Sequence, residues 1–152
     1  MKKILVPVDG SRHSHQAVET AVKMAKQMNS RITLINVVNP VASILFASSG
    51  EVGRYDDKIA ELSKKMKKES ENLISRFVED LKKQGIEVEG LSLEGYPADL
   101  IIKYAEEKPY DLVIMGSVGL GKGAKSLILG STTNKVMHQL NIPLLIVKEY
   151  PQ

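Results

Sequence analysis

Five short apolar runs, rich in β-branched residues, alternate along the chain with stretches of helical periodicity. The runs cover residues 3–8, 31–38, 87–93, 112–115 and 143–148. Strands that are apolar along their whole length are typical of parallel sheets buried on both faces, and parallel strands need crossover helices between them. The alternation therefore predicts an α/β fold, an open five-stranded parallel sheet with helices on both faces.

The stretches between these runs contain signals that begin and end helices. Apolar residues recur at spacings of three and four over residues 17–28, with Ser11 as the expected N-cap. A longer helix is predicted over residues 56–84 and ends at Gly85. Pro97 begins a third predicted helix, and a fourth covers residues 132–140.

Length and composition narrow the class of protein. The 152 residues fit a single domain, 1–152, and the net charge of +3 comes from 21 basic and 18 acidic residues. The basic run at residues 64–68 has acidic neighbours on the same predicted helix, which favours a solvated face over a nucleic-acid patch. The chain has no cysteine, which excludes disulfides and thiolate metal sites. The apolar run at residues 4–8 is too short for a signal peptide or a membrane span, so we expect a cytoplasmic protein without membrane or nucleic-acid partners.

The longest irregular stretch covers residues 39–55 and contains an apolar run at residues 41–47. A loop of this length is often functional or mobile. Three interpretations stay open, namely a cover for the core, a lid and a partner surface, and we place the core cover first.

A glycine-rich segment follows the fourth predicted strand, at the edge of the sheet where ligands of open parallel sheets bind. It contains Gly116, Gly119, Gly121 and Gly123, and Gly130, Ser131 and Thr132 then begin a helix. Glycines let the backbone approach a ligand, and a helix start offers unpaired N–H groups and the positive end of its dipole. We interpret the segment as a phosphate cradle. The alternative is a flexible surface turn in which Ser131 is only an N-cap.

The same segment is close to the P-loop pattern. Gly116 and Gly121-Lys122 have its spacing, but Gly123 stands where a Ser or Thr should hold magnesium, and no helix begins there. A P-loop NTPase is therefore disfavoured.

Two residues at the ends of the first two predicted strands carry weaker signals. Asp9 is interpreted either as an acceptor for ribose or support for a metal, or as a turn residue with Gly10. Val38 offers either its backbone to an adenine edge or its side chain to the core.

The histidines do not form an evident catalytic or metal-binding set. His13 and His15 are two positions apart at the start of a helix, and His138 is far away in the sequence. Ser11 lacks the strand–turn–helix setting of a hydrolase nucleophile. We therefore predict no catalytic residues and no metal ligand from the protein.

Three segments together resemble universal stress proteins. They are Ile-Leu-Val-Pro-Val-Asp-Gly-Ser at 4–11, Asp-Leu-Val-Ile-Met-Gly-Ser at 111–117, and Gly130-Ser131 followed by Ile-Pro-Leu-Leu-Ile-Val at 142–147. The resemblance covers essentially the whole chain and implies a Rossmann-like fold of the adenine nucleotide alpha hydrolase-like type.

Members of that family that bind ATP have a loop of the form Gly, two residues, Gly, nine residues, Gly-Ser or Gly-Thr. Gly116 and Gly119 satisfy its first part, but ten residues, 120–129, separate Gly119 from Gly130. We expect the neighbouring glycines to absorb the extra residue, with altered contacts around residues 121–124.

The resemblance implies a site for an adenine nucleotide, ATP or else ADP or AMP, with magnesium held through the phosphates. The residues assigned to the adenosine half are Pro7, Val8, Asp9 and Val38, and Met115 brings its backbone to the same crevice. The residues assigned to the ribose and phosphates are Gly116, Gly119, Gly121, Gly130, Ser131 and Thr132. It also implies a homodimer through the last strand, between Pro143 and Lys148, an apolar edge that would otherwise be exposed.

Three functions remain open on this basis. The first is an ATP-binding regulatory or stress-response module that changes its contacts with an unknown protein partner. It would have little turnover, because no general base or arginine finger is evident at the loop. The second is a slow ATPase or nucleotidyl-transfer enzyme assisted by Asp9 or Lys122. The third is a dimerising protein that binds no nucleotide.

Overall fold

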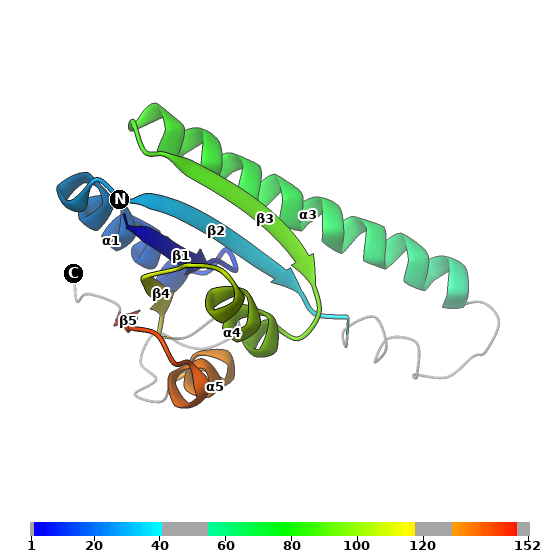
Figure 1. Ribbon diagram of the computed structural model, residues 1–152. Coiled ribbons are helices and arrows are strands. Elements are labelled where there is room, and N and C mark those ends of the chain that lie inside the picture. The colour runs from blue at the N-terminus through cyan, green and yellow to red at the C-terminus, as the bar shows by residue number, and fades with distance from the viewer. Residues whose placement is uncertain (1, 41–54, 118–128, 149–152) are drawn as a thin grey trace.

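Strands and helices alternate as predicted in residues 2–40, 55–117 and 129–148, the part of the chain that the computed structural model describes (Figure 1). The elements are β1 (Lys3–Pro7), α1 (Arg12–Met28), β2 (Arg31–Val38), α3 (Tyr55–Lys83), β3 (Val88–Glu94), α4 (Pro97–Glu107), β4 (Leu112–Gly116), α5 (Ser131–Gln139) and β5 (Leu144–Val147). The predicted strand ends agree with these bounds to within a residue. The apolar run at residues 41–47 lies outside the described residues.

All five strands are parallel and have the order β3-β2-β1-β4-β5. The chain moves outward from the central β1 to β2 and β3, and then returns to β4 on the other side of β1. The predicted open parallel sheet is therefore confirmed, and β1 and β4 flank the point at which the direction of winding reverses.

Helices cover both faces of the sheet, because successive strand side chains point to opposite faces. Ile4 and Val6 are buried on one face, in a core with residues of α1 and α3, while Leu5 is buried on the other with residues of α4 and α5. Figure 1 shows α4 and α5 in front of the sheet and α1 and α3 behind it. The predicted doubly covered sheet is confirmed.

Local signals account for the ends of the helices. Ser11 is the N-cap of α1, and its Oγ accepts a hydrogen bond from the N–H of Ser14 at 3.2 Å, as predicted. Asn29 ends α1 in the left-handed conformation with φ 50°, and Gly85 follows α3 with φ 80°. No helix in the described ranges combines the length and apolar character needed to cross a membrane.

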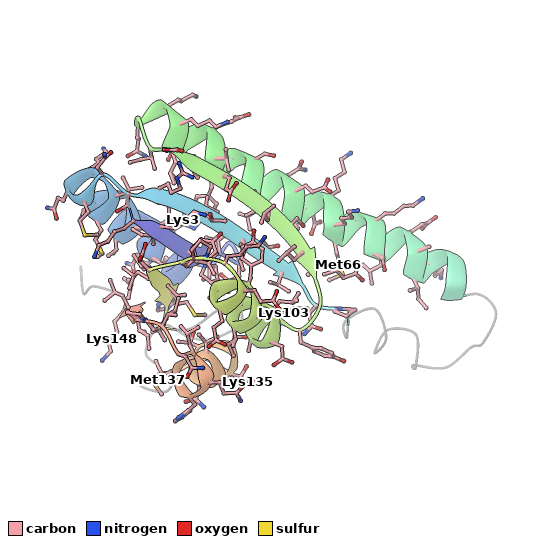
Figure 2. All side chains as sticks on the ribbon, in the orientation of Figure 1. Lys3, Met66, Lys103, Lys135, Met137 and Lys148 are labelled. Atoms are coloured by element: carbon pink, nitrogen blue, oxygen red, sulfur yellow. The ribbon has the colours of Figure 1, made fainter. Side chains whose placement is uncertain are left out.

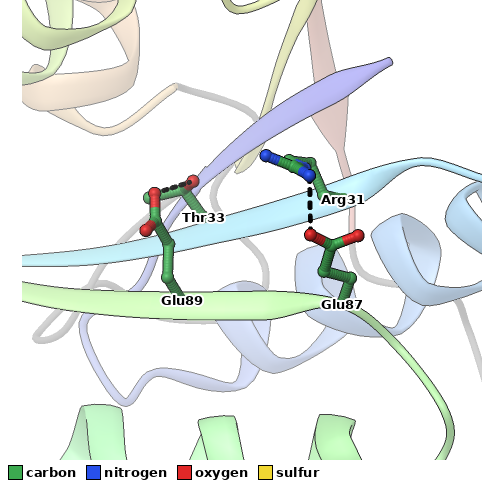
Figure 3. Close-up of polar contacts among 4 residues, drawn as sticks. All are labelled: Arg31, Thr33, Glu87 and Glu89. Carbon is green, nitrogen blue, oxygen red and sulfur yellow. Dashed lines mark hydrogen bonds and ion pairs between the residues drawn. The ribbon is translucent and has the colours of Figure 1, made fainter. Parts of the chain in front are cut away.

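The amino-terminal halves of β2 and β3 carry polar pairs rather than a site. Arg31 and Glu87 form an ion pair at 2.6 Å, and Thr33 Oγ1 donates to Glu89 Oε1 at 3.1 Å (Figure 3). Both partners of the ion pair are about half exposed, so its contribution to stability is on the order of 1 kcal/mol or less. These pairs lie at the opposite end of the strands from the cavity described next.

Candidate functional site

A cavity of about 670 Å³ lies beyond the carboxyl ends of β1, β2 and β4, at the point where the winding reverses. Ligands of open α/β sheets bind at this place, and small-molecule sites occupy about 300–1,000 Å³. Its walls come from the ends of β1, β2 and β4 and from the first turns of α1, α4 and α5. The described lining residues are Pro7, Val8, Asp9, Ser14, Ile35, Asn36, Val37, Asn39, Pro97, Ile101, Met115, Gly116, Gly130, Ser131, Thr132 and Thr133.

The structure brings most of the predicted site residues together around this cavity. They are Pro7, Val8, Asp9, Met115, Gly116, Gly130, Ser131 and Thr132. Val38 does not line it, because the Val38 carbonyl accepts a hydrogen bond from Gly95 N–H at 2.9 Å, whereas its neighbours Val37 and Asn39 do. Gly119 and Gly121, as well as Lys122, lie outside the described residues.

Asp9 forms the turn that leads from β1 into α1. Its Oδ1 accepts a hydrogen bond from Ser11 N–H at 2.9 Å, and Gly10 between them has a φ of 81°. The Ser14 hydroxyl donates to the Ser11 carbonyl at 3.0 Å and lies 3.4 Å from Asp9 N, whose N–H donates to it. The turn role that the sequence left open for Asp9 is thus present, and it places the Asp9 carboxylate in the wall of the cavity.

Sequence reasoning missed Asn36, which lies on the second wall. Its Nδ2 donates to the Val8 carbonyl at 2.6 Å, and Val8 N–H donates to the Ile35 carbonyl at 2.8 Å. These bonds tie the ends of β1 and β2 together on the side that faces α4. A polar residue inside an otherwise apolar strand was the signal that pointed to this position.

The third wall is the amino terminus of α5. Gly130, not Ser131, is the N-cap, with φ −59° and ψ 154°, and no side chain caps the helix. The first N–H groups of a helix have no partner within it, so those of Ser131, Thr132 and Thr133 are available to an anion. The Thr133 hydroxyl, also missed from the sequence, donates to the Gly116 carbonyl at 2.9 Å and fixes α5 against β4.

The two neighbouring histidines have different surroundings. His13 is 7% exposed, and its Nδ1 lies 3.3 Å from the Ser117 Oγ. His15 is exposed, donates from Nδ1 to the Ser11 carbonyl at 3.0 Å, and contacts the Phe77 ring of α3. Among the described residues no three His, Asp or Glu side chains are grouped so that they could hold a metal ion.

Comparison with known proteins decides the family. The profile of the universal stress protein family matches residues 1–148. The chain belongs to the universal stress protein family. The universal stress protein YxiE of Bacillus subtilis is 31% identical over 146 residues, which cover 96% of this chain and 98% of that protein. A universal stress protein of Thermus aquaticus is 31% identical over 147 residues, 97% and 98% of the two chains.

Solved structures of the family share the fold. The structure of MJ0577 from Methanocaldococcus jannaschii, 27% identical, superposes with a TM-score of 0.83 over 99% of this chain and 98% of that one. A universal stress protein in complex with cAMP has a TM-score of 0.63 at 24% identity, and one from Archaeoglobus fulgidus in complex with dAMP has 0.62 at 21%. The alignments cover 97% of this chain in both cases, and 96% and 98% of the other chains.

Proposed function

We propose that this universal stress protein binds an adenine nucleotide, in first place ATP, in the cavity at the winding reversal. In this proposal it acts as a regulatory module whose contacts with a protein partner change with nucleotide occupancy. The observation that carries the proposal is the uncapped amino terminus of α5, which opens onto a cavity of nucleotide size.

The two ends of the cavity differ in the way a nucleotide requires. The phosphates fit the first turn of α5, where Gly130 leaves the backbone N–H groups uncovered. The base fits the opposite end, between the last residues of β2 and the α4 side chain Ile101, which is 2% exposed. The family members solved with cAMP and dAMP support an adenine base.

Magnesium would reach this site with the phosphates. Asp9 is the one carboxylate among the described lining residues, and its Oδ1 already accepts the Ser11 N–H. A lone carboxylate suits support of a metal that the phosphates hold, and it reduces the charge repulsion that Asp9 would otherwise exert on them.

We further propose a homodimer through β5. This four-residue strand forms one edge of the sheet, where Leu144, Leu145 and Ile146 are only partly buried. Met137 on the neighbouring α5 is 42% exposed, and Figure 2 shows it on the same side of the molecule as Lys148 after β5. An apolar edge of this kind is usually covered by a partner strand.

Titration calorimetry of the nucleotide-stripped protein with ATP and magnesium tests the nucleotide site. The test variant is Gly130→Val, because φ −59° and ψ 154° accommodate valine and the new side chain would stand beside the N–H groups of α5. The control is Gly85→Ala, which strains a position with φ 80° at the opposite end of the sheet. We expect saturable binding in the wild type and the control and about tenfold or weaker binding in Gly130→Val. Equal binding by all three proteins, or none by the wild type, contradicts the proposed site.

A further inference from the structure

We propose that His13 is a positioning residue for the phosphate end of this site, which it stabilises through Ser117 without touching the ligand. The inference rests on the nucleotide function proposed above. It assigns a role to a buried histidine that is not among the described residues lining the cavity.

The first step is the contact between α1 and the end of β4. A Cβ on Gly116 would lie 2.7 Å from the His13 Cβ and 2.9 Å from its carbonyl oxygen, so the two segments meet at backbone distance. The His13 ring then reaches past Gly116, and its Nδ1 forms a hydrogen bond with the Ser117 Oγ at 3.3 Å. His13 thereby fixes the residue at which β4 ends.

The second step leads from Ser117 to α5. The Ser117 carbonyl accepts a hydrogen bond from Gly130 N–H at 2.9 Å, and Ser117 N–H donates to the Val147 carbonyl at 3.0 Å. The same residue therefore bonds α1 through its side chain, and the N-cap of α5 and the end of β5 through its backbone. A shift of Ser117 passes to Gly130 through a single hydrogen bond, and from there to the N–H groups of α5 that face the cavity.

The base end of the cavity has a separate set of hydrogen bonds. Asn36 and Val8 join the ends of β1 and β2, and neither contacts Ser117 in the described hydrogen bonds. Loss of the His13 bond should therefore weaken binding of phosphate groups and leave binding of adenosine unchanged. A general loss of stability would weaken both.

The chain provides a matched control in the same helical turn. His15 also uses Nδ1 in a hydrogen bond, but with the Ser11 carbonyl, and its ring packs on Phe77 rather than on β4. His15→Ala removes an imidazole from α1 without removing a contact to Ser117.

The experiment measures affinities of the full chain for ATP with magnesium, inorganic tripolyphosphate and adenosine by titration calorimetry. In His13→Ala we expect about tenfold weaker binding of ATP and tripolyphosphate, the loss of one hydrogen bond, and adenosine affinity within about twofold of the wild type. His13→Asn should restore most of the affinity, because the asparagine amide reaches the position of Nδ1. Ser117→Ala should match His13→Ala, and the double variant should be no weaker than either, since both remove the same bond.

Several outcomes overturn the inference. Unchanged ATP affinity in His13→Ala contradicts it while the proposed nucleotide site stands. A parallel loss for ATP and adenosine, or the same loss in His15→Ala, indicates a general effect of destabilised α1. A wild type that binds neither ATP nor tripolyphosphate overturns the proposed nucleotide site and the role of His13 together.

Discussion

Gly116 and His13 are in contact through their backbones, so that a Cβ on Gly116 would lie 2.8 Å from the carbonyl carbon of His13. Side-chain atoms at such a distance can turn away, but a helix backbone moves only as a unit. We therefore expect Gly116→Ala to lower the free energy of unfolding by about 1–3 kcal/mol, as overpacking does. Urea denaturation measures the change. A free energy of unfolding within about 0.5 kcal/mol of the wild type would show that α1 moves away from β4 at little cost.

The free edge of β5 makes the dimer testable at one N–H group. The carbonyls of Pro143 and Val147 accept hydrogen bonds from β4, so by alternation the N–H of Ile146 points away from the sheet. Ile146→Pro removes that donor and keeps the bonds to β4. We expect a dimeric wild type and a monomeric variant in sedimentation equilibrium, with the free energy of unfolding of the variant monomer reduced by about 1 kcal/mol or less.

The matched control for this experiment is Leu145→Pro. The N–H of Leu145 faces β4, so its loss breaks the sheet itself and should cost about 3 kcal/mol. A dimer that persists in Ile146→Pro would place the interface elsewhere, and a monomeric wild type would contradict the proposed dimer.

Tyr110 gives the fold a dependence on alkaline pH. Burial raises the pKa of its phenol to about 12, against the lowering effect of the hydrogen bond with Thr33. Since the pKa is higher in the folded than in the unfolded chain, the stabilisation is complete below pH 10 and is lost as the pH rises towards 12. The loss amounts to at most about 2.7 kcal/mol. We expect this decline in denaturation curves of the wild type and its absence in Tyr110→Phe, and parallel curves for the two proteins would contradict the shift.

Local signals in the sequence were sufficient for the elements and for much of the site. Ser11 and Gly85 mark helix ends through their own chemistry, and Asp9 and Gly116 lie at strand ends that a parallel sheet brings to one edge. The sequence therefore predicted both the fold and the edge where the cavity lies.

The remaining contacts depend on three-dimensional packing. Val38 bonds to the Gly95 backbone rather than lining the cavity, and which residue of β2 faces a ligand follows from its register with β1 and β3. His13 and Ser117 are 104 positions apart, so no spacing in the sequence could have joined them. The role of Thr133 likewise depends on how closely α5 approaches β4.

Gly90 allows the packing of α3 on β3 to be tested by a compensating pair. A Cβ at Gly90 would lie 2.3 Å from the Ile74 Cγ2 and 2.8 Å from the Val78 Cγ2, both on side chains of α3. Gly90→Ala alone should lower the free energy of unfolding by about 1–3 kcal/mol, and Ile74→Ala alone, which empties a core position, by about 2–5 kcal/mol. Because the new methyl group would occupy part of the space left by Ile74, we expect the double variant to lose less than the sum of the two, by about 0.5–3 kcal/mol. Strict additivity in urea denaturation would mean that the two positions do not share this space.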